Sequence, residues 1–97
     1  KALYFSAVLS KDNSQRILDY LAHTDFTDKL PAGVPKNIPV AHKVGVYNTG
    51  LYSDCGIVYA PRRPYLLCEL SQSDEKEARK RMVRVSKMIY DYVSTVN

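Results

Sequence analysis

The sequence has no tryptophan, only two cysteines and only two histidines in 97 residues. The cysteines, Cys55 and Cys68, have neither C-x-x-C spacing nor the ligand spacing of a zinc site, so we expect no metal, and no cofactor either. No apolar run approaches the ~20 residues of a membrane-spanning helix, and the start of the chain lacks the pattern of a signal peptide. Because the chain begins at Lys1 and not at Met, we expect a fragment or a processed product of a longer protein.

Positive charge outweighs negative charge, with 14 Lys and Arg against 10 Asp and Glu and a net charge of +4. Much of the positive charge gathers near the end of the chain, where Asp and Glu interrupt it. This pattern allows two interpretations, a surface for nucleic acid or the solvated face of a helix. No aromatic side chain interleaves with the charged run, so we favour the helix face and expect no nucleic-acid partner. The basic residues are Lys76, Arg79, Lys80, Arg81, Arg84 and Lys87.

Residues 1–30 are expected to be helical with one interruption. Ala2–Leu9 is apolar and is expected to end a helix, and Ser10–Ser14 forms a turn with good N-cap residues. A second helix follows from Gln15, because its apolar residues recur on one face. Residues 31–39 contain three prolines and a glycine, which exclude regular structure and predict a shaped connector. The apolar residues of the second helix are Ile17, Leu18, Leu21 and Ala22.

Residues 40–70 are predicted to form an antiparallel meander of three strands, separated by turn residues. The third strand is too apolar for an exposed edge, so we expect another strand beside it, from sequence outside this chain. Its side chains alternate between two faces, with Leu66, Cys68 and Leu70 on one and Tyr65, Leu67 and Glu69 on the other. The three predicted strands are Val40–Tyr47, Cys55–Ala60 and Tyr65–Leu70.

Residues 73–97 are predicted to form the C-terminal helix. Ser73 is a good N-cap, and Asp74 and Glu75 in the first turn suit the helix dipole. Apolar residues at steps of three and four form one stripe that would cover the sheet. The fold class is therefore α+β, a three-stranded antiparallel meander covered by a C-terminal helix, with a preceding helix. The stripe consists of Ala78, Met82, Val85, Ile89, Tyr92 and Val96.

Four segments resemble one family in the same order and spacing. Leu30–Gly33 reads LPAG and Val40–Gly45 reads VAHKVG, close to a phrase of the form LPAG…VAHKTG. Residues 14–21 and 54–61 resemble the helix before that phrase and the strand after it. The family is the class A β-lactamases with their penicillin-binding relatives, and the final helix resembles theirs. The resemblance covers nearly the whole chain, 1–97, and implies the C-terminal part of a β-lactamase/transpeptidase-like domain.

The resemblance also implies roles for three residues of the VAHKVG segment and its continuation, Lys43, Gly45 and Val46. The Lys43 ammonium would lie near the substrate carboxylate and the catalytic proton network. Gly45 has no Cβ and would let the substrate approach the backbone. The backbone N–H of Val46 would be one donor of an oxyanion hole.

Two residues depart from the family pattern. Val44 replaces a Thr or Ser whose hydroxyl binds the substrate carboxylate, and Cys55 stands where many members have an Arg. A valine side chain forms no hydrogen bond, so the presence of Val44 in place of a Thr or Ser should weaken carboxylate binding by roughly 1.5–3 kcal/mol. Both departures put efficient β-lactam hydrolysis in question.

The implied parent is a serine hydrolase that acts on β-lactams or peptidoglycan-type acyl-D-Ala peptides outside the cytoplasm, periplasmic or secreted. Its nucleophile is expected in a missing N-terminal part of the same fold, because the literal Ser-x-x-Lys here, Ser73–Lys76, opens a helix downstream of Lys43. The departures at Val44 and Cys55 favour an alternative, a non-catalytic β-lactamase-like binding or scaffold module. Without the resemblance, Lys43 is best interpreted as a solvent-facing lysine of an edge strand.

The cysteines and histidines allow further expectations. Cys55 and Cys68 fall on adjacent strands, where a disulfide requires directly opposite positions, and we favour buried free thiols. His23 is predicted to be an exposed residue at a helix end, and His42 a strand residue beside Lys43. Neither histidine has a Ser or Cys partner by spacing, so no His-based triad is expected.

Overall fold

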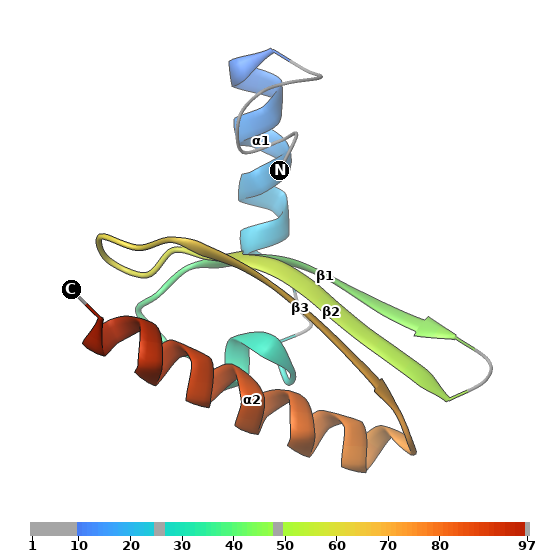
Figure 1. The fold of residues 1–97 in the computed structure, drawn as a ribbon. Helices are drawn as coiled ribbons and strands as arrows, with labels where there is room; N and C mark the ends of the chain where they lie inside the picture. Colours follow the sequence, from blue (N-terminus) through green and yellow to red (C-terminus); the bar gives the residue numbers. More distant parts are fainter. Residues whose placement is uncertain (1–9, 25–26, 48–49, 97) are drawn as a thin grey trace.

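The computed structural model describes residues 10–24, 27–47 and 50–96, so the helix predicted over 2–9 lies outside the described residues. Two α-helices and a three-stranded antiparallel sheet form the α+β fold that the sequence predicts (Figure 1). In chain order the elements are α1 (Lys11–Ala22), the 3-10 helix η1 (Leu30–Gly33), β1 (Val40–Tyr47), β2 (Leu51–Val58), β3 (Tyr65–Gln72) and α2 (Glu75–Thr95). The turn predicted over Ser10–Ser14 is wrong, because the Ser10 hydroxyl caps α1 by accepting from the Asn13 N–H and the helix starts at Lys11. The helix also ends at Ala22 and does not continue to residue 30.

The sheet lies between two unequal layers. α2 runs along one face with η1 between it and the sheet, and α1 stands on the other side with its C-terminal end nearest the strands (Figure 1). The strand order is β1–β2–β3, so within the described residues each outer strand pairs on one side only. We call their outer sides the β1 edge and the β3 edge.

The strands are as predicted at β1 and longer than predicted elsewhere. β2 begins at Leu51 rather than Cys55 and ends at Val58 rather than Ala60, and β3 continues to Gln72 rather than Leu70. The reason is the pairing, which starts directly at Tyr47 opposite Leu51. Gly50 permits this tight start, since its φ of 75° is favourable for glycine and strained for other residues.

The connector 31–39 contains regular structure at its beginning, contrary to the prediction. η1 covers Leu30–Gly33, and Pro31 fits there because the first turn of a helix needs no donor from that residue. Gly33 lets η1 lie directly on α2. A Cβ on this glycine would lie 2.6 Å from the Val83 carbonyl oxygen and 2.7 Å from the Lys87 nitrogen.

α2 begins one residue later than the predicted cap implied. Asp74, not Ser73, is the N-cap, and its carboxylate accepts a hydrogen bond from the Glu77 backbone N–H at 2.8 Å. The acidic residues in the first turn, Glu75 and Glu77, suit the positive end of the helix dipole.

The buried side of α2 is only partly the predicted one. Ala78 and Met82 are buried, but Val85 is exposed and Tyr92 is 70% exposed. Ser86 is buried instead, and its hydroxyl donates to the Leu30 carbonyl at 2.7 Å. A pattern of apolar residues could not mark this serine, because its burial depends on that acceptor in η1.

The buried apolar core is small and lies between η1, the start of β1 and the end of β2. Its position leaves the later half of β1 outside the core, where the candidate functional residues lie. The core residues are Leu30, Val34, Val40, Val58 and Ala60.

Candidate functional site

The β1 edge carries the lysine that the sequence singled out. Lys43 is exposed, and its Nζ donates to the Val44 carbonyl oxygen at 2.5 Å. Gly45 is half-buried and Val46 is exposed. Residues 43–46 therefore form a partly exposed strip on an outer strand, and Lys43 is its one charged side chain.

The hydrogen-bond alternation along β1 decides which backbone groups face outward. The Tyr59 N–H donates to the Pro39 carbonyl at 3.0 Å, next to the Val40–Val58 pair. In an antiparallel ladder, bonded and non-bonded pairs alternate, so the even-numbered residues of β1 direct their N–H and C=O groups away from β2. The Val46 N–H therefore points toward the β1 edge, where a ligand can accept from it.

The space around Gly45 would accommodate a Cβ more easily than the space around a tightly packed glycine. A Cβ there would lie 2.5 Å from the Ser53 Oγ, the end of a short side chain that can rotate away. The next nearest atoms belong to the Tyr47 side chain at 3.7 Å and beyond. Packing against the described residues therefore gives little reason for a glycine at position 45.

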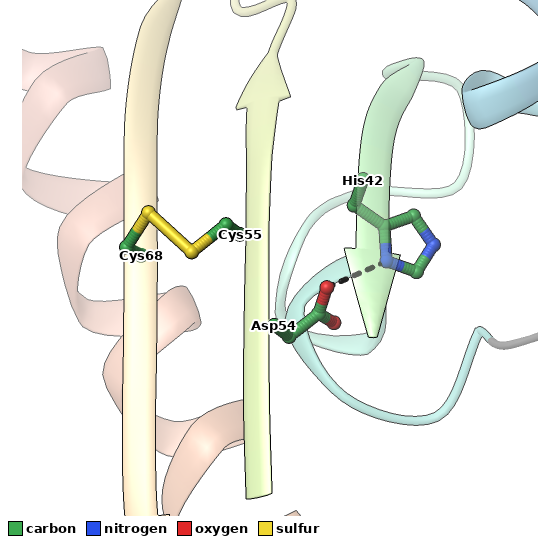
Figure 2. Close-up of a disulfide and its surroundings, with 4 residues drawn as sticks. All are labelled: His42, Asp54, Cys55 and Cys68. Atoms are coloured by element: carbon green, nitrogen blue, oxygen red, sulfur yellow. Dashed lines mark hydrogen bonds and ion pairs between the residues drawn. A yellow bond between two sulfur atoms is a disulfide. The ribbon is translucent and has the colours of Figure 1, made fainter. Parts of the chain in front are cut away.

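A disulfide joins β2 to β3 in the same cross-strand row as Lys43. Cys55 pairs with Lys43 on one side and with Cys68 on the other, and the two cysteines are bonded to each other (Figure 2). The expectation of free thiols is therefore wrong. The register puts the two residues directly opposite, with Cα atoms 4.0 Å apart, and the loop length alone did not determine that register.

His42 belongs to a buried polar relay that the sequence did not reveal. Its Nδ1 lies 2.7 Å from the Asp54 Oδ1 (Figure 2), and its Nε2 lies 2.9 Å from the Thr24 Oγ1. Asp54 is fully buried and also accepts from the Leu30 N–H at 3.1 Å. In the neutral imidazole, Nδ1 donates to Asp54 and Nε2 accepts from the threonine hydroxyl. These hydrogen bonds connect four parts of the fold beside Lys43. Thr24 follows α1, His42 is in β1, Asp54 is in β2 and Leu30 is in η1.

The relay depends on a glycine in β2. His42 lies opposite Gly56, where a Cβ would be 2.6 Å from the histidine Cβ and 2.8 Å from the Ala41 carbonyl oxygen. A sequence signal existed in the two polar residues, His42 and Asp54, within apolar strands. The partner Thr24 gave no such signal, because it lies 18 residues before the histidine. The other histidine, His23, is exposed at the end of α1 as predicted.

Glu69 is a second buried carboxylate, opposite Asp54 in the sheet. It is 7% exposed, and neither of its oxygens has a hydrogen-bond partner within the described part of the chain. Burial, with a smaller effect of the Asp54 charge, raises the pKa of Glu69 from 4.5 to about 7. Burial also raises the pKa of Tyr65, and Tyr90 and Glu69 add to that effect. The sequence analysis placed Glu69 on the same face of the third strand as Tyr65 and Leu67, but assigned it no role.

The remaining sequence features have structural explanations. Lys76 is exposed in the first turn of α2, so Ser73–Lys76 has a structural explanation as the entry to that helix. Within residues 10–24, 27–47 and 50–96, no group of His, Cys, Asp or Glu is arranged to hold a metal ion. No helix among those residues is long and apolar enough to cross a membrane.

A cavity of about 1090 Å³ lies between α1 and the connector, away from the β1 edge. Thr24 and His42 line it, but Lys43 and Val46 do not. The strip around Lys43 therefore lies outside this cavity.

Three comparisons bear on this geometry. A model of the beta-lactamase enzyme family matches residues 1–93. Beta-lactamase 3 of Bacillus cereus is 34% identical over 73 residues, which cover 73% of this chain and 23% of that protein.

Solved structures share the fold. The structure of PBP-A superposes with a TM-score of 0.83 at 23% identity, covering 98% of this chain and 37% of that one. A class A beta-lactamase from Clostridium kluyveri gives a TM-score of 0.76 at 33% identity, covering 90% of this chain and 35% of that one. The chain thus spans about a third of these structures and about a quarter of the curated relative.

Proposed function

The chain belongs to the beta-lactamase enzyme family, and we propose on that basis that it is the C-terminal part of a serine hydrolase. The proposed substrates are β-lactams or peptidoglycan-type acyl-D-Ala peptides. The observation that carries the proposal is the β1 edge, where an exposed lysine and an outward backbone N–H lie three residues apart, at Lys43 and Val46. The nucleophilic serine and its base belong to the part of the fold that this chain does not contain.

In the proposed mechanism a serine hydroxyl oxygen attacks the substrate carbonyl carbon, and negative charge develops on the carbonyl oxygen. The Val46 N–H donates a hydrogen bond to that oxygen, and the serine's own amide supplies the second donor. The Lys43 ammonium attracts the substrate carboxylate and supports proton transfer around the serine. Gly45 leaves room for the substrate to lie along the edge.

Two features of the chain would weaken its binding of the substrate carboxylate. Val44 has no hydroxyl for the substrate carboxylate, and Cys55 is held in a disulfide with Cys68 where an arginine would assist binding. These observations favour a second candidate function, a non-catalytic β-lactamase-like binding or scaffold module. The two functions differ in whether a covalent acyl adduct forms.

The proposed location is extracytoplasmic, periplasmic or secreted, and the proposed partners are the remaining N-terminal part of the fold and a β-lactam or cell-wall peptide. The Cys55–Cys68 disulfide supports this location, because such bonds form and persist mainly in oxidising compartments.

The test is covalent labelling of the whole parent protein with a fluorescent penicillin. The expected result is a labelled band, and the substitution Lys43→Ala is expected to slow labelling by on the order of 100-fold. The matched control is Lys36→Ala, an exposed lysine in the connector, which should label at the normal rate. A folded parent that forms no adduct would contradict the hydrolase and favour the scaffold module.

A further inference from the structure

Thr24, His42 and Asp54 are joined by two hydrogen bonds in the order of a catalytic triad. The Thr24 Oγ1 lies 2.9 Å from the His42 Nε2, and the His42 Nδ1 lies 2.7 Å from the Asp54 Oδ1. A triad is recognised by a hydroxyl within reach of a base, together with a third group that orients the base. The spacing of Ser and Cys residues predicted no triad, whereas the fold brings a threonine hydroxyl to His42 from 18 residues earlier in the chain.

Asp54 determines which ring nitrogen of His42 is free to accept a proton. It is fully buried, and its second oxygen, Oδ2, accepts from the Leu30 N–H at 3.1 Å. Figure 2 shows the other ring nitrogen of His42 on the side of the imidazole away from this carboxylate. With Nδ1 donating to Asp54, the neutral ring presents the lone pair of Nε2 to the Thr24 hydroxyl. A proton can therefore pass from the Thr24 oxygen to Nε2, and the buried carboxylate stabilises the imidazolium that forms.

Both partners of this proton transfer line the cavity of about 1090 Å³ between α1 and the connector. Thr24 is half-buried, so its side chain lies within the protein and still contacts the cavity. A cavity of this size holds a small organic molecule. The connector contributes Pro35, Ile38 and Pro39 to the cavity wall, and these apolar side chains suit an apolar acyl group.

We propose that Thr24 is the nucleophile of an acyl-transfer site in this cavity, with His42 as its general base and Asp54 as the orienting carboxylate. The proposed substrates are small esters with an apolar acyl group. The site is separate from the β1 edge, because Lys43 and Val46 do not line the cavity. All three reacting or orienting side chains belong to this chain, so the inference does not rest on the proposed function.

The proposed reaction is hydrolysis of an ester through an acyl-threonine. The Thr24 Oγ1 forms a bond to the carbonyl carbon of the ester while its proton passes to the His42 Nε2. The bond from that carbon to the alcohol oxygen then breaks, and the departing oxygen takes the proton from Nε2. Water next attacks the acyl carbon and gives a proton to Nε2, and this proton returns to Oγ1 as the acid leaves. Ester and water are the only reactants, and alcohol and acid are the only products.

The first test treats the whole parent protein with diisopropyl fluorophosphate, which reacts with hydroxyl groups that a general base activates. Peptide mass spectrometry then locates the adduct, and a phosphoryl adduct on Thr24 is expected. Cys55 and Cys68 are bonded to each other, so neither offers a competing thiol. An unlabelled Thr24, or equal labelling of Thr24 and the exposed Thr95, would overturn the proposal.

Variants separate a nucleophile from a merely structural hydroxyl. Thr24→Val keeps the shape of the side chain without its oxygen, so labelling at position 24 should disappear. His42→Gln should slow formation of the Thr24 adduct at least ~100-fold, because general-base catalysis contributes a factor of this order. Thr24→Ser retains the hydroxyl and should be labelled at least as fast as Thr24. The control Thr95→Val, an exposed residue of α2, should leave the labelling rate of Thr24 unchanged.

A second measurement needs no variant, and so does not depend on the folding of His42→Gln. The protein is incubated with 4-nitrophenyl butyrate, the reaction is stopped in acid at successive times, and mass spectrometry locates the acyl groups. A butyryl group on Thr24 is expected while ester remains, and it should be lost when the ester is exhausted. Butyryl groups on lysines alone, or a butyryl-threonine that is never hydrolysed, would contradict the proposed reaction.

The outcomes for this site and for the proposed serine hydrolase are distinguishable. A parent protein that forms a penicillin adduct but no adduct at Thr24 would retain the proposed function and overturn this inference. A parent with a Thr24 adduct and no penicillin adduct would do the reverse.

Discussion

The two outer strands of the sheet have opposite characters. The β1 edge presents Lys43 and an outward N–H at Val46, and the buried Asp54 behind it accepts from His42 and Leu30. The β3 edge presents leucines, and the buried Glu69 beside it has no donor within the described chain. The buried carboxylate behind the β1 edge is thus satisfied, whereas the one beside the β3 edge has no donor among the described residues.

The largest effect is expected from removing Asp54. Asp54→Ala leaves the His42 Nδ1–H and the Leu30 N–H buried without an acceptor, and should lower the free energy of unfolding by about 3–5 kcal/mol. Urea denaturation of the 97-residue chain measures this. The control Asp91→Ala breaks an exposed pair with Lys87 and should cost less than about 1 kcal/mol. A loss at Asp54 as small as the control's would mean that the β1 edge does not depend on the relay.

The second largest loss of stability is expected at Gly56 of β2, and it is compared with the same substitution at Gly45 of β1. Gly56→Ala forces a Cβ against the His42 Cβ and the Ala41 carbonyl, and should destabilise the chain by about 2–3 kcal/mol. Gly45→Ala meets only the Ser53 hydroxyl within 3 Å, which can rotate, and should cost under about 1 kcal/mol. Thermal denaturation of both variants provides the comparison. If Gly45→Ala were the more damaging, the glycine would be required by the fold rather than kept free for a ligand.

A smaller effect is expected from pH at the β3 edge. The pKa of Glu69 rises from 4.5 to about 7 on folding, so between these values the folded state binds more protons than the unfolded state. The free energy of unfolding should therefore fall as pH rises from 4.5 to 7, by on the order of 1–2 kcal/mol. The loss is complete above pH 7, and the stabilisation is fully present below 4.5.

Denaturation of the chain at a series of pH values checks this dependence. Glu69→Gln should flatten the curve in that window, and the exposed Glu75→Gln should leave its slope unchanged. A slope that survives Glu69→Gln would assign the effect to another group and would remove the contrast between the two buried carboxylates.

The fold was largely predictable from local patterns. The Pro-rich connector that ends at Pro39 and the turn residues after Tyr47 gave β1 its correct limits, and the charge and periodicity after Ser73 gave α2. The start of β2 was not predictable, because Ser53 and Asp54 read as turn residues and only pairing with β1 makes them strand. Burial of a polar residue likewise depends on a partner distant in sequence.

The candidate site divides in the same way. Lys43 and its neighbours came from a resemblance of short motifs, which the family comparison supports at the level of the whole segment. The disulfide, the Thr24–His42–Asp54 relay and the unpartnered Glu69 all depend on cross-strand register or on contacts across 12 or more residues. Periodicity determines which face a side chain occupies, but not which residue lies opposite it.

The smallest effect tests the β3 edge from its exposed face. Leu70 is 71% exposed, so Leu70→Thr should change the stability of the 97-residue chain by less than about 0.5 kcal/mol. The same substitution at Leu67, which packs against the core on the other face, should cost about 1–2 kcal/mol. In the whole parent protein Leu70→Thr should also become costly, by more than about 1 kcal/mol, because an added strand and its neighbours would bury the leucine. Equal, small effects in chain and parent would mean that nothing covers this edge, and the two outer strands would then differ in composition but not in use.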